Sequence, residues 1–570
     1  MIEAKNVPTI EAIHRLRDLA TVLDQLKLQD ECMVVGNCAI KLAQALGLRA
    51  EEFQWELAQT MTLIAILGAY ESRMRPLFIQ AISICEASVI EDGSALAKMK
   101  LFLVLRYAGT YATKYPALSA QWLGRAIDLI AELPPALVTI LPNEHHGIIY
   151  GSYGMSLCKL KQYPKALAAQ EHAVALYRSL ASSHNGPRHK QGLACALHTH
   201  GIILVKMGHL ENALRVEREA VSLLRALVVR GEEGKKELVD ALLNHGNTLY
   251  EKDRLEDALS VQRETISLCR ALVIHWEEEH KERLVLSLQT CGYTLSKMGR
   301  LEDARSVQRE NVTLLRALVV HGQVKHQEQL AVALLSYGGT LFKMGSLEDA
   351  SNTQRETVSL FRALLIHGEE KRVNLADALL SYGNTLYETG RLEEALSVQR
   401  ETVSLCRVLV VHEEEHKERL ALALQSCGCI FYKMGRLEDT LSVQRESVTL
   451  FRAVVVHQVK HEVQLALALV NHGNTLFQMQ CLEDVLNIQQ ETISLFRALV
   501  IQREDQRVNL ADALLRHGYT LYAMGRLEDA LSVQRETISL YRALVIHGEE
   551  HKEKLALALT LSLLLRFAEY

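Results

Sequence analysis

A unit of about 45 residues, repeated along most of the chain, restricts the fold more than any other feature of the sequence. From Gly246 the chain reads GNTLYEKDRLEDALSVQRETISLCRALVIH, and from Gly383 it reads GNTLYETGRLEEALSVQRETVSLCRVLVVH. Alignment on this glycine, here called the anchor glycine, gives repeats spaced 45 to 47 residues apart. The anchors are Gly154, Gly201, Gly246, Gly292, Gly338, Gly383, Gly428, Gly473 and Gly518. Such a regular period predicts a stacked array rather than one large core.

Each repeat divides into two predicted helices, here called helix A and helix B. Helix A surrounds the anchor glycine and ends at a short break such as KMGR, where Gly299 suits the left-handed conformation that follows a helix. Helix B begins with acidic residues such as Glu256 and Asp257, which favour the positive end of a helix. Its apolar stripe comprises Ala258, Val261, Thr265, Leu268 and Leu272. Neither helix can bury its stripe alone, so the sequence predicts an all-α solenoid.

The chain divides into three regions by the regularity of this pattern. Residues 1–144 read as a degenerate helical region, in which Gly109 stands near an anchor position. Residues 145–550 hold the nine regular repeats, and residues 551–570 are predicted to form a capping helix. Leu563 replaces the expected anchor glycine there, and the segment LALALTLSLLLRF is apolar for a cap. Truncation of the chain, or self-association through this helix, is therefore an alternative to simple capping.

The repeat resembles the tetratricopeptide repeat family. An anchor glycine is followed twelve residues later by alanine in Gly246 with Ala258 and in Gly383 with Ala395, which looks like the small-residue signature of that family. Units this long are similar to those of kinesin light chains and to the tetratricopeptide tails of fungal nucleotide-binding (NB-ARC, or STAND) signalling ATPases. The resemblance implies a right-handed superhelical α-solenoid of helix–turn–helix repeats, with helix A lining a concave groove that binds proteins.

A higher-order period suggests that a block of three repeats was duplicated. An aspartate stands six residues before the anchor in every third repeat, at Asp240, Asp377 and Asp512. Chemically similar surfaces are therefore expected to recur every three repeats.

Four positions of helix A are predicted to face the groove. At 100° per residue, the positions −6, −3, +1 and +4 from the anchor fall within about one quarter of the circumference. Asn pairs with peptide main chain and Tyr offers a flat amphipathic surface, so this row suits an extended peptide or a short helix. Packing between helices is the alternative role of these side chains. The candidate residues are Asp240, Asn247, Tyr250, Gln289, Tyr293, Asp377, Asn384, Tyr387, Gln425, Tyr432, Asn474, Asp512, Tyr519 and Tyr522.

Composition narrows the partners and the compartment. The formal charge is −5, from 63 basic and 68 acidic residues, which disfavours nucleic acid as a general ligand. It also disfavours the alternative that the chain is a helical-repeat protein that binds single-stranded RNA. No uncharged apolar run is long enough to cross a membrane, so no membrane association is expected. The eleven cysteines show no framework spacing and read as core residues in a reducing compartment, which favours the cytoplasm.

One catalytic motif and one signalling role remain as alternatives. His412–His416 spells HEEEH, the zinc-hydrolase pattern with His412 and His416 as ligands and Glu413 as base. The corresponding connectors HWEEEH and HGEEH differ in spacing, which favours charged, exposed links. No phosphate-binding loop is present, so no cofactor and no catalysis are predicted. The chain is thus interpreted as a scaffold for a protein or peptide partner of unknown identity, or as the sensor arm of a signalling ATPase.

Overall fold

The computed structural model describes most of the chain, and the regular secondary structure of the described residues is helical. The described ranges are 10–25, 35–36, 38–41, 51–67, 71–112, 114–138, 143–183, 186–229, 234–273, 279–319, 324–365, 371–412, 416–455, 460–545 and 551–568. The chain forms two compact parts, the N-terminal half (Met1–Thr290) and the C-terminal half (Cys291–Tyr570). Each half is described by itself.

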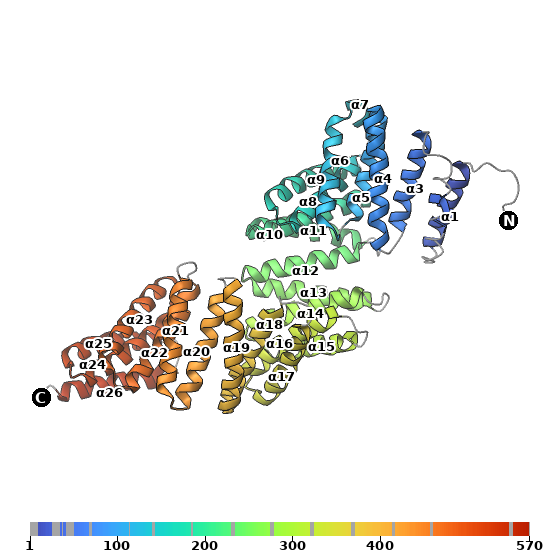
Figure 1. Cartoon of the computed structure of the whole chain (residues 1–570). Helices are drawn as coiled ribbons and strands as arrows, with labels where there is room; N and C mark the ends of the chain where they lie inside the picture. The colour runs from blue at the N-terminus through green and yellow to red at the C-terminus, as the bar shows by residue number, and fades with distance from the viewer. Residues whose placement is uncertain are drawn as a thin grey trace. The chain divides into compact units, whose positions relative to one another are not determined.

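The N-terminal half consists of helical hairpins (Figure 1). From α8 onward, even-numbered helices are helix A of a repeat and odd-numbered helices are helix B. The helices are α1 (Ile10–Gln25), α3 (Glu51–Leu67), α4 (Glu71–Asp92), α5 (Ala95–Tyr111), α6 (Pro116–Glu132), α7 (Pro135–Val138), α8 (Asn143–Lys159), α9 (Tyr163–Ser183), α10 (Pro187–Lys206), α11 (Leu210–Val228), α12 (Lys235–Glu251), α13 (Leu255–Val273) and the first part of α14 (Glu279–Lys297).

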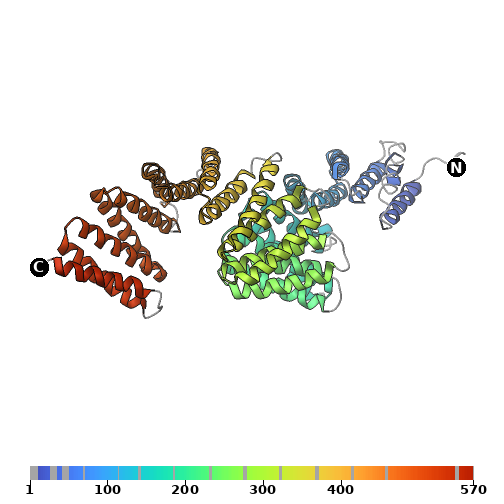
Figure 2. The ribbon, with the colours of Figure 1, turned by 90° about the horizontal axis from the view of Figure 1, so that it is seen from below.

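The C-terminal half continues the alternation of helix A and helix B. Its last hairpins follow one another in chain order in both views (Figures 1 and 2). Its helices are the end of α14, then α15 (Leu301–Val319), α16 (Val324–Lys343), α17 (Leu347–Leu364), α18 (Arg372–Glu388), α19 (Leu392–His412), α20 (Lys417–Lys433), α21 (Leu437–Val455), α22 (Lys460–Gln478), α23 (Leu482–Gln502), the 3₁₀ turn η4 (Glu504–Gln506), α24 (Arg507–Ala523), α25 (Leu527–Val545) and α26 (Lys552–Ala568). The predicted all-α repeat solenoid is confirmed.

The turn between helix A and helix B forms as the sequence predicts. Gly299 has a φ of 75°, and the N–H of Arg300 donates to the Leu295 carbonyl at 3.0 Å, which satisfies a carbonyl at the end of α14. The Arg300 guanidinium then binds Asp303 in the first turn of α15, with Nε 2.9 Å from Oδ2. The turn therefore ends one helix and aligns the next.

In most repeats the anchor glycine is needed because a glutamine side chain from helix B lies across it. A Cβ added at Gly383 would lie 2.5 Å from Nε2 and 2.9 Å from Cγ of Gln399. At Gly292 the corresponding atom is Cγ of Gln308, at 2.7 Å. Both glutamines are buried. Close packing of helix A on helix B is therefore the role of the glycine at these positions.

Two of the helix B glutamines connect consecutive repeats. Gln308 donates through Nε2 to Ser336 Oγ, and Gln354 donates to Ser381 Oγ, each at 2.8 Å. In each case the serine belongs to helix A of the next repeat. A buried amide that bonds across this boundary fixes the register of neighbouring hairpins.

Glu217 stands where the other repeats carry this glutamine. It is buried, accepts a hydrogen bond from Thr248 Oγ1 at 2.9 Å, and lies 3.3 Å from His245 Nδ1. The acceptor oxygens of the carboxylate are thus satisfied by helix A of the following repeat.

A row of ion pairs joins successive helices B on their exposed side. In a typical pair, Arg407 Nη2 lies 2.9 Å from Glu446 Oε2, and both side chains are more than 40% exposed. The equivalent pairs are Arg178–Glu219, Arg225–Glu264, Arg316–Glu356, Arg362–Glu401, Arg452–Glu491 and Arg497–Glu536. Because solvent screens such pairs, each contributes little to the free energy of unfolding. Their regular recurrence reflects the constant alignment of successive helices B.

Removing one of these pairs is expected to have a small effect. Glu446→Gln should change the free energy of unfolding by less than about 1 kcal/mol, the usual contribution of an exposed ion pair. Urea denaturation of the variant and the wild type at low salt and at about 1 M salt tests this, since high salt should abolish the difference. A loss above about 2 kcal/mol at either salt concentration would contradict the interpretation.

Candidate functional site

A hollow of about 370 Å³ lies on the helix A surface of the C-terminal half. Its lining comes from four helices A, in chain order α16, α18, α20 and α22. The lining residues are Phe342, Leu380, Asn384, Tyr387, Glu388, Leu422, Gln425, Ser426, Cys429 and Gln464. Three predicted site residues, Asn384, Tyr387 and Gln425, therefore contribute to one hollow.

Most of the lining occupies the four helix A positions that the sequence singles out. Leu422 stands at −6, Leu380 at −3, Cys429 at +1 and Phe342 at +4. Sequence reasoning omitted these residues because it selected Asn, Tyr, Gln and Asp at those positions. Selecting every residue at these four positions, whatever its type, would have identified them.

The amide of Asn384 is held in one orientation by helix B of its own repeat. Its Oδ1 accepts a hydrogen bond from Gln399 Nε2 at 3.1 Å, and the same nitrogen lies 3.2 Å from the Leu380 carbonyl. With Oδ1 engaged, Nδ2 is the group that can donate to a ligand. The buried Gln399 thus links the packing of α18 on α19 to the surface of the hollow.

Tyr387 and Cys429 remain uncharged at neutral pH. Burial raises the pKa of the Tyr387 hydroxyl, helped by the nearby Cys429 and Glu388, and burial also raises the pKa of the Cys429 thiol. The Lys433 ammonium lies 4.5 Å from the centre of the Tyr387 ring, a cation–π contact that holds the ring. Glu388 is the charged residue in the lining, so the hollow presents mainly amides, leucines and aromatic rings.

The three periodic aspartates bind basic residues of the next helix A. Arg283 Nε lies 2.7 Å from Asp240 Oδ1, and Arg419 Nε lies 2.9 Å from Asp377 Oδ1. Asp512 accepts from Lys554 Nζ at 2.6 Å and also from the Tyr541 hydroxyl. The predicted ligand-binding aspartates are therefore engaged in contacts between repeats.

The other predicted residues lie on separate helices A of the two halves. Tyr293, Tyr519 and Tyr522 are exposed. Asn474 accepts through Oδ1 from Arg516 Nη1 at 2.8 Å. The half-buried members are Asn247, Tyr250, Gln289, Tyr432 and Asn474.

Sequence comparison identifies a family for part of the array. Residues 375–416 and 510–551 match the Tetratricopeptide repeat family. Two repeats are therefore similar to tetratricopeptide repeats. These stretches span α18–α19 and α24–α25, and the first of them contributes Asn384 and Tyr387 to the hollow.

Comparisons with whole proteins are distant. The crystal structure of BtubC (BKLC) from P. vanneervenii is 13% identical, with a TM-score of 0.36, and the match covers 44% of this chain and 93% of that chain. The crystal structure of the apo form of RapI is 12% identical, with a TM-score of 0.44, and the match covers 78% of this chain and 99% of that chain. Among curated proteins none matches the chain. Neither structural likeness transfers a function.

The HEEEH motif falls at the edge of the first tetratricopeptide stretch. Glu413 and the side chain of His412 lie outside the described residues. His416, the residue before α20, is buried rather than exposed. Its Nδ1 lies 3.3 Å from Arg419 Nη1. The prediction of an exposed connector was therefore wrong at this end of the motif. Within the described part of the chain, no three His, Cys, Asp or Glu side chains gather closely enough to hold a metal ion.

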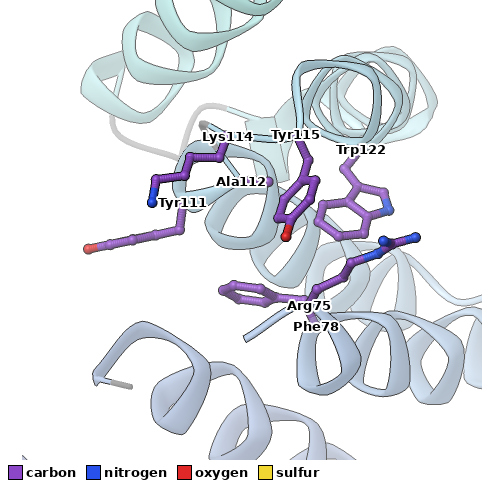
Figure 3. Close-up of a pocket in the computed structure, with 7 residues that line it drawn as sticks. All are labelled: Arg75, Phe78, Tyr111, Ala112, Lys114, Tyr115 and Trp122. Carbon is purple, nitrogen blue, oxygen red and sulfur yellow. The ribbon is translucent and has the colours of Figure 1, made fainter. Parts of the chain in front are cut away.

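A cavity near the N-terminus is too small for a ligand (Figure 3). Arg75 and Phe78 of α4 face Tyr115 and Trp122 of the α6 region, with the Arg75 guanidinium 5.6 Å from the Tyr115 ring centre. The cavity holds about 20 Å³, room for about one water molecule. This cluster therefore serves to pack α4 on α6. Among the described residues no helix is long and apolar enough to cross a bilayer.

Proposed function

We propose that the chain is a non-catalytic scaffold that binds a segment of a partner protein in the hollow formed by α16, α18, α20 and α22. The observation that supports this most directly is the meeting of Asn384, Tyr387 and Gln425 in one concave surface. A hollow of about 370 Å³ lies within the range of natural binding sites, which starts at roughly 300 Å³. The two tetratricopeptide matches agree with a role in protein binding.

The lining favours an uncharged stretch of polypeptide. The Asn384 and Gln425 amides can pair with main-chain N–H and C=O groups, and Leu380, Leu422 and Tyr387 offer apolar contact to its side chains. A phosphorylated or strongly acidic segment would find no basic side chain in this lining. The partner is therefore expected to present apolar and small polar residues in an extended or short helical form.

The cysteines support a reducing compartment such as the cytoplasm for this scaffold. The described cysteines are unpaired, and burial raises the pKa of Cys85 and of Cys427 to about 12. Such thiols are almost fully protonated and act as core residues.

Replacing Tyr387 should remove most of the binding. Tyr387→Ala deletes the largest ring in the hollow and should weaken partner binding at least about tenfold, because central aromatic residues dominate interface energetics. The control is Tyr522→Ala, which changes the same repeat position on α24, outside this hollow. The measurement is affinity capture from extract with mass spectrometry, followed by titration of the recovered partner.

The two variants separate the possible outcomes. Partners lost with Tyr387→Ala and retained with Tyr522→Ala would support the hollow as the binding site, provided both proteins match the wild type by circular dichroism. Retention by both variants would contradict it. Recovery of a nucleotide-binding ATPase in a Tyr387-dependent manner would specify the scaffold as the sensor arm of a signalling system.

A further inference from the structure

Aromatic side chains occupy one repeat position on consecutive helices A of the C-terminal half. It is the +4 position, four residues after the anchor glycine. Two of these side chains, Phe342 and Tyr387, line the hollow, and Phe477 on α22 is 40% exposed. From α16 to α22 the aromatic residues at this position, here called the ring row, are Phe342, Tyr387, Tyr432 and Phe477. Tyr522 repeats the pattern on α24.

The fold does not require an aromatic residue at the +4 position. Although α12 carries Tyr250 there, three other helices A carry Cys158, Val205 and Ser296. The ring of Phe477 stays exposed even though α22 has helices A before and after it in the array. The ring row is therefore a feature of the surface rather than of the packing between helices.

The spacing of the ring row matches one backbone conformation of a ligand. Successive helices A are in contact, as shown by Arg419 of α20, whose Nε lies 2.9 Å from Asp377 Oδ1 of α18. Packed helices lie roughly 8–10 Å apart, so rings at the same position of neighbouring helices have about this separation. A polyproline II segment advances about 9 Å in each turn of three residues. A β-strand repeats the side chains of one face every 7 Å or so, which does not fit.

The amides of the hollow offer what a polyproline II segment lacks. Such a segment has no internal hydrogen bonds, so its carbonyl groups need donors from outside. Asn384 is engaged through Oδ1 and can donate through Nδ2, and Gln425 adds a second amide. Proline has no N–H group that would need an acceptor. A helical ligand would use its carbonyl groups internally and leave these donors without a partner.

We propose that the partner segment is rich in proline and lies across α16, α18, α20 and α22 in the polyproline II conformation, with every third residue against a ring of the row. The segment is already extended before it binds, so it loses little conformational entropy. Four rings are separated by three intervals of about 9 Å, a length that about ten residues of polyproline II span. This inference rests on the proposed function of the hollow and names the chemistry of its ligand.

Fluorescence anisotropy of labelled synthetic peptides, titrated with the full chain, tests the class of ligand. The probes are an oligoproline of about ten residues, a Gly–Ser peptide of the same length and a helical peptide with a leucine stripe. The oligoproline should bind at least about tenfold more tightly than either control. An oligoproline of about five residues reaches only two rings, so it should bind at least about tenfold more weakly than the longer one.

Two substitutions outside the lining of the hollow test the ring row. Phe477→Ser and Tyr432→Leu each remove one ring, and each should weaken binding of the longer oligoproline at least about fivefold. The matched control is Tyr522→Ser on α24, one interval beyond the row, which should change the affinity less than about twofold. Phe477 and Tyr522 are 40% and 39% exposed, so both serine variants should match the wild type by circular dichroism.

Failure of this inference and failure of the proposed function give different results. Equal affinity of the wild type, Phe477→Ser and Tyr432→Leu for the oligoproline would overturn the ring row as its binding surface. Preference for the helical peptide would overturn the polyproline II conformation. No oligoproline binding up to about 1 mM, with capture of a partner that still depends on Tyr387, would overturn the proline-rich ligand and leave the hollow as the binding site. Loss of the Tyr387 dependence as well would overturn both proposals.

Discussion

Gly383→Ala is expected to destabilise the protein although alanine is the better helix former. The added methyl group would lie 2.5–2.9 Å from three atoms of Gln399, a side chain that is buried and hydrogen-bonded. Overpacking of this kind costs about 1–3 kcal/mol, whereas relief of the glycine entropy gains roughly 0.5–1 kcal/mol. The net loss should be about 1–2 kcal/mol, measured as a lower urea midpoint.

The control is the same substitution at another anchor. At Gly473 the nearest atom to an added Cβ is Ile488 Cγ2 at 3.6 Å, an ordinary contact, because Gln489 bonds instead to Thr520 and His517. Gly473→Ala should therefore be neutral or stabilise the protein by up to about 1 kcal/mol. Equal effects of the two substitutions would show that the glutamine does not determine the need for glycine.

The contact at Gly383 also joins the packing to the candidate site. Gln399 crosses the anchor glycine and donates to Asn384 on the wall of the hollow. A side chain displaced by the added methyl group would no longer hold the Asn384 amide. Gly383→Ala should therefore weaken partner binding as well as stability, whereas Gly473→Ala should leave binding unchanged. A solenoid repeat of this kind cannot separate its core packing from its concave surface.

The local structure could be predicted from the sequence because each feature depends on nearby residues. Helix lengths, the left-handed Gly299 and the acidic start of helix B all follow from spacing within one repeat. The position of these residues on one face of helix A was also predictable, because it depends on helical periodicity alone. Asn384, Tyr387 and Gln425 were identified in this way, and Leu380 and Leu422 were missed through their residue type.

The contacts between repeats could not be predicted because they depend on the offset of one hairpin against the next. Asp377 stands on the predicted face, yet its partner Arg419 comes from another helix A 42 residues later. No periodicity within a helix indicates that pairing. The glutamine of helix B was equally inconspicuous in the sequence, although it determines why the anchor must be glycine.

Acidification is expected to destabilise the array through its buried histidines. The contribution of His472 to this loss of stability can be measured separately by substitution. Burial, together with Arg445 and Arg452, lowers the pKa of His472 to about 4, against partial compensation from Asp484. The unfolded chain has the ordinary value of 6.5 and therefore binds more protons than the folded chain between about pH 6.5 and pH 4. Stability falls as the pH drops through this window, and the loss from His472 between pH 7 and pH 5 should be about 2 kcal/mol.

His472→Tyr removes this proton-binding difference without introducing a foreign residue, because Tyr337 and Tyr382 occupy the same position in other repeats. The urea midpoint should fall less between pH 7 and pH 5 in the variant than in the wild type, with pH 6 as an intermediate measurement. A residual slope is expected from His517, whose pKa is also lowered by burial and by Arg526 and Arg497. If the urea midpoint depended on pH equally in the two proteins, His472 would take up a proton as readily in the folded chain as in the unfolded one. The destabilisation by acid would then have another source.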